Sequence, residues 1–152
     1  MGLNIANLKI QSTEFASGGK LSAIHSQDEE NKIPQLEISG VPSNAKELVV
    51  ICHDPDAPLP HGFTHWTLYG IPADTTDIGP GSDAKFKAGP NGMGAPGYLG
   101  PQPPVGHGVH HYYFWVYALD TVISGTPTRE EFLSRYSENI VEQNRVVATF
   151  QR

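Results

Sequence analysis

Residues 47–53 read Glu47-Leu48-Val49-Val50-Ile51-Cys52-His53, a run that is apolar and β-branched on both of its faces. A strand of this kind belongs in the middle of a sheet that is covered on both sides. The run leads into the turn Asp54-Pro55-Asp56-Ala57-Pro58, in which two prolines restrict the backbone. The sequence therefore predicts a central strand that delivers two carboxylates to its end.

Two longer stretches have the composition of further strands. Residues 63–71 follow a two-residue period that places Phe63 and His65 on one face. Residues 110–119 are dense in aromatic and β-branched side chains. Shorter extended segments are expected at 146–150, at 8–15 and at 33–38, where Pro34 favours an edge position.

A helix is predicted near the C-terminus. Thr128 and Glu131 are three residues apart and precede an apolar run, which is the pattern of a capping box. Apolar residues then recur at helical spacing as far as Val141, so we expect helix to about Asn144. The 16 glycines and 13 prolines, many of them at 72–109, favour a turn-rich β protein over a helical bundle.

Composition limits the class of protein. The chain of 152 residues has the length of one ordinary domain, so we expect a single domain over residues 1–152. Its 16 acidic and 10 basic residues give a net charge of −6 without a Lys/Arg cluster, which argues against a nucleic-acid partner. A single cysteine, Cys52, fits a reducing compartment. Without a signal-peptide pattern or an apolar run of about 20 residues, we expect a cytoplasmic protein with no stable membrane insertion.

The histidines are concentrated in one part of the chain, because six of the seven lie between His53 and His111. His110 and Tyr112 are two residues apart in a predicted strand, so they share a face about 6.6 Å apart. If the strand ends converge, Asp54 and His65 join them. Imidazolium N–H and tyrosine O–H groups suit phosphate or carboxylate oxygens, and Asp54 can hold one histidine in its cationic form. We therefore expect a small-anion pocket that needs no cofactor and no metal.

Two other chemistries stay open for the same residues. The run from Gly106 to His110 invites comparison with a cupin-like metal site, which gives the Asp-Pro-Asp-Ala-Pro turn no role. A metal-free acid/base enzyme, such as a cyclase, an isomerase or a hydrolase, is the stronger rival. Its catalytic set would be His65, His110, Tyr112 and Asp54. We expect a binding protein more than an enzyme.

Four motifs in order resemble the phosphatidylethanolamine-binding protein family, in its bacterial and archaeal Raf kinase inhibitor-like branch. They are His53-Asp54-Pro55-Asp56-Ala57-Pro58, Phe63-Thr64-His65-Trp66, Gly97-Tyr98-Leu99-Gly100-Pro101-Gln102-Pro103-Pro104 and Gly108-Val109-His110-His111-Tyr112. The resemblance runs from about Pro34 to the end of the chain.

The resemblance implies a mainly β fold, an antiparallel Greek-key β-sandwich with a few peripheral helices including one near the C-terminus. It also implies one pocket for phosphate, a phospholipid head group or another phosphorylated ligand. The expected ligand-binding residues are Asp54, Asp56, His65, Gly100, Gln102, Pro103, His110 and Tyr112. Backbone N–H groups of Gly100 and Gln102 could add donors. Regulation of a kinase and a homodimer are further partner interactions that we keep open.

Overall fold

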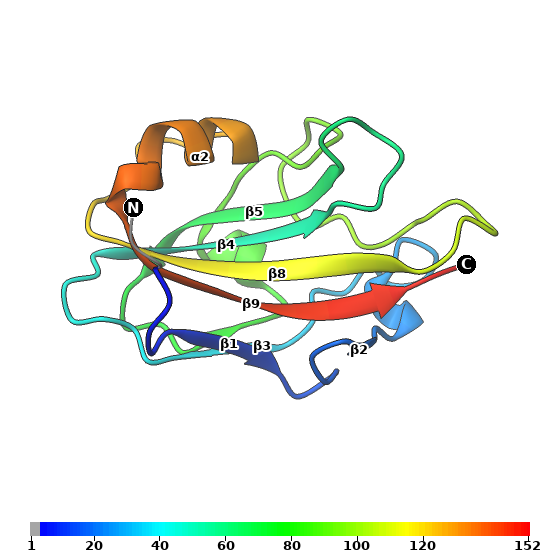
Figure 1. The fold of residues 1–152 in the computed structure, drawn as a ribbon, viewed down its shortest axis with the longest axis horizontal. Helices are drawn as coiled ribbons and strands as arrows, with labels where there is room; N and C mark the ends of the chain where they lie inside the picture. Colours follow the sequence, from blue (N-terminus) through cyan, green and yellow to red (C-terminus); the bar gives the residue numbers. More distant parts are fainter. Residues whose placement is uncertain (1–3) are drawn as a thin grey trace.

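The computed structural model describes residues 4–152, which form two sheets packed face to face with a helix on the outer side of the larger one (Figure 1). The larger sheet has six strands, in the spatial order β2 (Gly19–Lys20), β9 (Ile140–Phe150), β8 (His110–Leu119), β4 (Glu47–Asp54), β5 (Phe63–Pro72) and β7 (Lys87–Ala88). The smaller sheet has the order β1 (Lys9–Ser12), β3 (Leu36–Ser39) and β6 (Asp77–Ile78). All neighbours run antiparallel except β2 and β9. The predicted mainly β sandwich is confirmed.

The predicted central strand is confirmed as β4, which pairs with β5 on one side and with β8 on the other. All eight of its residues are buried. Leu48 and Val50 enter the core between the two sheets, where they meet β-strand side chains such as Leu36 and Phe114. Val49 and Ile51 enter a second core on the opposite face. Burial of such a side chain contributes about 1.5–3 kcal/mol, so β4 anchors both layers.

The N-terminal strands differ from the sequence prediction in length and position. The strand expected at 8–15 is limited to β1, and the strand expected at 33–38 begins only at Leu36. The edge position predicted from Pro34 is wrong, because β3 lies between β1 and β6. Pro34 precedes the strand, so its missing N–H removes no hydrogen bond from the ladder.

The helices are short. They are η1 (Ala23–His25), α1 (Ser82–Lys85), α2 (Arg129–Tyr136) and η2 (Ser137–Asn139). None of the helices in residues 4–152 combines the length and the apolar composition needed to cross a bilayer. The longest, α2, covers the outer face of the large sheet through Phe132, whose ring packs against Tyr69 and Tyr117.

The start of α2 is as predicted, but its end is not. Thr128 Oγ1 accepts the Glu131 N–H at 3.1 Å, and Glu131 Oε1 accepts the Thr128 N–H at 2.9 Å, so the capping box is confirmed. The helix ends at Tyr136 rather than near Asn144, and β9 begins at Ile140 rather than at 146. The apolar spacing continues past the helix, but β9 pairs with β8 along its length, from Ile140 to Phe150. Tertiary pairing overrides the local helical pattern.

Replacing Thr128 with Ala should lower the free energy of unfolding by about 1 kcal/mol, because the Glu131 N–H loses its acceptor. Urea denaturation measures the change. Thr126→Ala is the matched control, since Thr126 is exposed and stands outside the capping box. Equal midpoints for Thr128→Ala and the unmodified protein would contradict the cap.

Acid should destabilise the fold through His53. Burial, with a smaller effect of the Arg129 charge, lowers the pKa of His53 to about 4. In the unfolded chain an imidazole has a pKa of about 6.5, so the unfolded state binds the proton more tightly. The stability contributed by neutral His53 is therefore complete above about pH 6.5 and is lost as the pH falls toward about 4. His65, whose pKa burial also lowers, acts in the same direction.

Urea denaturation midpoints measured between about pH 4 and about pH 7 test this contribution of His53 to stability. The midpoint should fall with pH less steeply in His53→Gln than in the unmodified protein. His61→Gln, which changes an exposed histidine of the neighbouring turn, should keep the original slope. Equal slopes for all three proteins would contradict the role of His53.

Candidate functional site

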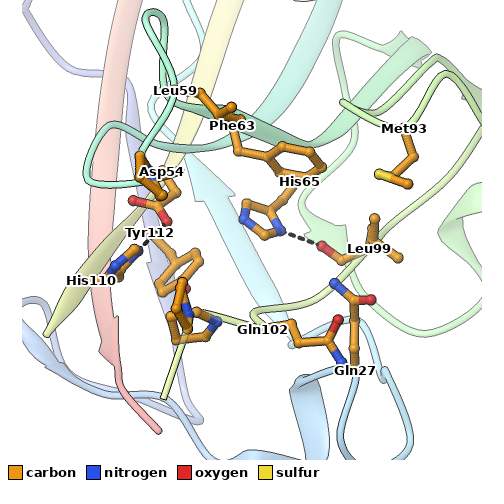
Figure 2. A pocket seen from close by; sticks show the side chains of 14 residues that line it. Gln27, Asp54, Leu59, Phe63, His65, Met93, Leu99, Gln102, His110 and Tyr112 are labelled. Atoms are coloured by element: carbon orange, nitrogen blue, oxygen red, sulfur yellow. Dashed lines mark hydrogen bonds and ion pairs between the residues drawn. The ribbon is translucent and has the colours of Figure 1, made fainter. Parts of the chain in front are cut away.

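A cavity of about 390 Å³ opens where the ends of β4, β5 and β8 meet (Figure 2). This volume lies within the range of small-molecule sites. Its polar lining includes Asp54, His65, His110 and Tyr112, the four residues that the sequence analysis placed together. The three strand ends therefore converge as predicted.

Asp54 joins the turn after β4 to the start of β8. Its carboxylate is buried, at 2% exposure, and Oδ2 accepts the Nδ1–H of His110 at 2.7 Å. The other oxygen, Oδ1, accepts the backbone N–H of Asp56 at 2.7 Å, the geometry of an Asx turn. One side chain thus shapes the turn and orients an imidazole of the cavity.

His65 is the extra residue of a β-bulge. Cys52 pairs with Trp66 and His53 pairs with Thr64, so His65 has no partner on β4. Bulges re-aim a side chain, and they occur next to functional sites. Here the ring lies between Phe63 and Tyr112, with centroid distances of 4.8 and 5.1 Å.

The protonation of His65 follows from its partner. Its Nδ1 lies 2.6 Å from the Leu99 carbonyl oxygen, which can only accept, so Nδ1 carries the proton. Burial lowers the pKa of His65, despite the Leu99 carbonyl and the charge of Asp54, and the ring is neutral near pH 7 with a lone pair on Nε2. The expectation of a cationic histidine does not hold for His65. The Asp54 carboxylate is hydrogen-bonded to His110 instead.

Tyr112 supplies a donor. The side chain is 1% exposed, and its hydroxyl has no hydrogen-bond partner within residues 4–152. Burial raises the pKa of Tyr112 well above its usual range, so the hydroxyl keeps its proton. An unsatisfied buried hydroxyl costs about 1–3 kcal/mol, which a bound acceptor would offset.

His107 extends the polar network to the surface. Its Nδ1 lies 2.7 Å from Nε2 of His110, and the residue is exposed in the loop before β8. Asp54, His110 and His107 therefore form a hydrogen-bonded chain from a buried carboxylate to solvent. From sequence His107 is marked only as a loop residue, although it stands three residues before His110 in a glycine-flanked loop.

Asp56 does not line the cavity. Its Oδ2 accepts both the backbone N–H and the Nδ1–H of His111, at 2.8 and 2.7 Å. Burial by itself would raise the pKa of Asp56, but the hydrogen bonds from His111 outweigh it and lower the pKa. The predicted ligand residue instead fastens the turn to β8.

The expected rim is divided between lining and supporting residues. Gln102 and Pro103 line the cavity, but Gly100 does not. The Gly100 N–H donates to Asn31 Oδ1 at 2.6 Å, so it is not free for a ligand. A Cβ at this position would collide with the His25 carbonyl, so glycine allows the rim to pack on the N-terminal segment.

Apolar side chains form most of the remaining wall, and sequence reasoning missed them. Leu59 and Met93 are 54% and 73% exposed and stand at the mouth. Phe63 and Leu99 belong to the quoted motifs, but nothing marked them as lining residues. Gln27 comes from the N-terminal segment, and no sequence motif marked it as a lining residue. The other lining residues are Ala57, Pro58 and Pro104.

The metal alternative has no support in the geometry. Within the described part of the chain, no group of three or more His, Cys, Asp or Glu side chains is placed to hold a metal ion. The polar groups of the cavity suit recognition of an acceptor-rich ligand and proton transfer.

Comparison with known proteins agrees with the fold. A family model described as phosphatidylethanolamine-binding protein matches residues 11–151. A UPF0098 protein of Methanothermobacter thermautotrophicus is 35% identical over 154 residues, covering 95% of this chain and 99% of the relative. A UPF0098 protein of Archaeoglobus fulgidus is 36% identical over 144 residues, covering 91% of this chain; the match spans about half of the relative's length, 49%.

A solved structure from Chlamydia trachomatis, described as a putative phosphatidylethanolamine-binding protein homologue, superposes with a TM-score of 0.87. It is 30% identical, and the match covers 98% of this chain and 99% of that one. The chain belongs to the phosphatidylethanolamine-binding protein family.

Proposed function

We propose that this protein binds a small anion or the phosphate group of a phosphorylated ligand in the cavity at the ends of β4, β5 and β8. The observation that carries the proposal is the buried Tyr112 hydroxyl, a donor without a partner in residues 4–152. An oxyanion oxygen is the acceptor that would satisfy it. His110 lies beside it, with ring centroids 6.5 Å apart, and its Nε2, which is 2.7 Å from Nδ1 of His107, can donate to a ligand only where that contact opens.

The walls indicate what else the ligand carries. Polar groups gather around Asp54, His110 and Tyr112, whereas Leu59, Met93 and their neighbours make the mouth apolar. Sites of this kind orient a ligand through a few polar groups and bury its apolar part. The proposed ligand is therefore a phosphate or carboxylate group attached to an apolar moiety, as in a phospholipid head group or a phosphorylated metabolite.

A second function, metal-free acid/base catalysis, is favoured by one specific observation. The cavity brings a neutral imidazole, His65, within 5.1 Å, ring to ring, of a protonated phenol, Tyr112. Such a pair can accept and donate a proton, and the chain from Asp54 through His110 to His107 could exchange protons with solvent. We rank it below binding because no substrate chemistry follows from these groups.

Inorganic phosphate should stabilise the fold. At 100 times its dissociation constant a ligand adds about 2.7 kcal/mol, a rise in Tm on the order of 5–10 °C for a chain of this size. Tyr112→Phe removes only the hydroxyl and should abolish most of the shift. Tyr113→Phe, which changes a tyrosine that does not line the cavity, should retain it. Equal shifts in the two variants, or none in the unmodified protein up to tens of millimolar, would contradict the proposal.

The pH dependence separates binding from catalysis. Acetate stays a monoanion above about pH 5.5, so only protein groups titrate. In the binding model an imidazolium holds the anion, so the affinity for acetate should fall as the pH rises, and Asp54→Asn should weaken binding by removing the carboxylate that is hydrogen-bonded to His110. A catalytic site needs a neutral base, so turnover would instead rise with pH. Calorimetry that shows a flat or rising affinity would count against the binding model.

A further inference from the structure

We infer that the cavity selects a phosphate group in its singly protonated form, and therefore a phosphomonoester over a phosphodiester of the same charge. The inference rests on the proposed function and specifies its ligand. It follows from three features of the cavity: one fixed acceptor, one fixed donor and the absence of an excess positive charge.

The fixed acceptor is Nε2 of His65. Nδ1 of this ring is committed to the Leu99 carbonyl at 2.6 Å, and the rings of Phe63 and Tyr112 hold the imidazole from two sides. Figure 2 shows the second ring nitrogen pointing away from Leu99, toward the side of the cavity where Tyr112 and His110 lie. The Gly100 backbone also lies close enough to raise the pKa of His65, but the hydrogen bond that fixes the ring runs from Nδ1 to Leu99. A ligand that reaches Nε2 must bring a donor.

The fixed donor is the Tyr112 hydroxyl, which no described residue satisfies. The donor and the acceptor therefore belong to two rings in edge contact, with centroids 5.1 Å apart, that line the same cavity. The monoanion of a phosphomonoester matches both, because it offers one P–OH and two unprotonated oxygens. A phosphodiester offers acceptors only, so an oxygen would face the His65 lone pair and leave it unpaired.

The charges of the cavity favour a monoanion over a dianion. The lining contains no Lys or Arg. Its one charged pair, Asp54 and His110, sums to zero when the ring is protonated. Arg152, which donates to the Pro103 carbonyl at the rim, is paired with Asp28 at 3.1 Å. His107, the remaining titratable group next to His110, is exposed. A second negative charge would meet the Asp54 carboxylate without compensation.

Calorimetry with methyl phosphate and dimethyl phosphate tests the inference at about pH 6.5, slightly above the second pKa of a phosphomonoester, which is about 6. About a quarter of the methyl phosphate is then monoanion, and affinities are compared per monoanion, so that the two ligands differ in the P–OH group. Methyl phosphate should bind about tenfold tighter or more, the effect of one unpaired buried acceptor. Equal or tighter binding of dimethyl phosphate would overturn the inference and leave the proposed function intact. If inorganic phosphate and both esters fail to bind, the proposed function fails as well.

His65→Asn is the informative variant. Its amide N–H can keep the hydrogen bond to Leu99, while its own acceptor, Oδ1, sits on a shorter side chain and does not reach the position of Nε2. The ratio of the two affinities should fall to about one, a change of roughly tenfold. His61→Asn alters an exposed histidine of the neighbouring turn and should retain the original ratio. An unchanged ratio of methyl phosphate to dimethyl phosphate affinity in His65→Asn would overturn the role of Nε2. If this variant does not fold, the comparison of the two ligands on the unmodified protein still tests the inference.

The same chemistry can come from a free metabolite or from a lipid. Monomeric dihexanoyl phosphatidic acid carries a phosphomonoester, and dihexanoyl phosphatidylcholine carries a phosphodiester. Tighter binding of the phosphatidic acid than of methyl phosphate assigns the apolar mouth to acyl chains, and equal binding assigns the site to a free phosphomonoester. Both results support the inference. Binding of the two lipids with equal affinity would overturn it.

Discussion

The contact between Asp54 and His110 is the interaction on which the site depends. Both side chains are buried at 2% exposure, and their 2.7 Å hydrogen bond joins the end of one strand to the start of another. A buried carboxylate that loses its partner typically costs about 3–5 kcal/mol. The same carboxylate also holds the Asp56 N–H, so the turn after β4 and the orientation of His110 cannot vary independently.

Strand pairing brings the other groups to this contact. Because β4 runs antiparallel to both β5 and β8, its last residues lie beside the first residues of its neighbours: Asp54 pairs with Phe63, and His53 pairs with Tyr113. The bulge at His65 then gives β5 one residue more than β4. The cavity is thus a consequence of where three strands end, and its apolar mouth comes from the loops that follow them.

Much of this architecture follows from local patterns in the sequence. The two-sided apolar run of β4 and the capping box at Thr128 are short-range signals, and both are present in the structure. The end of α2 could not be read in this way, because pairing of β9 with β8 overrides helical spacing. The neutral state of His65 could not be predicted from local patterns either, because it depends on burial and on a carbonyl 34 residues away along the chain. The place of Asp56 outside the cavity could not be predicted locally either, since its partner His111 lies on another strand.

Nitrogen-15 NMR of the histidine side chains, recorded during a titration with methyl phosphate near neutral pH, tests the central claim most directly. The account predicts that in the free protein Nδ1 of His65 is protonated and Nε2 is not. It also predicts that methyl phosphate shifts the Nε2 signal toward that of a hydrogen-bonded acceptor and leaves Nδ1 unchanged. A proton on Nε2 of the free protein, or a His65 signal that does not respond at saturating ligand, would contradict it.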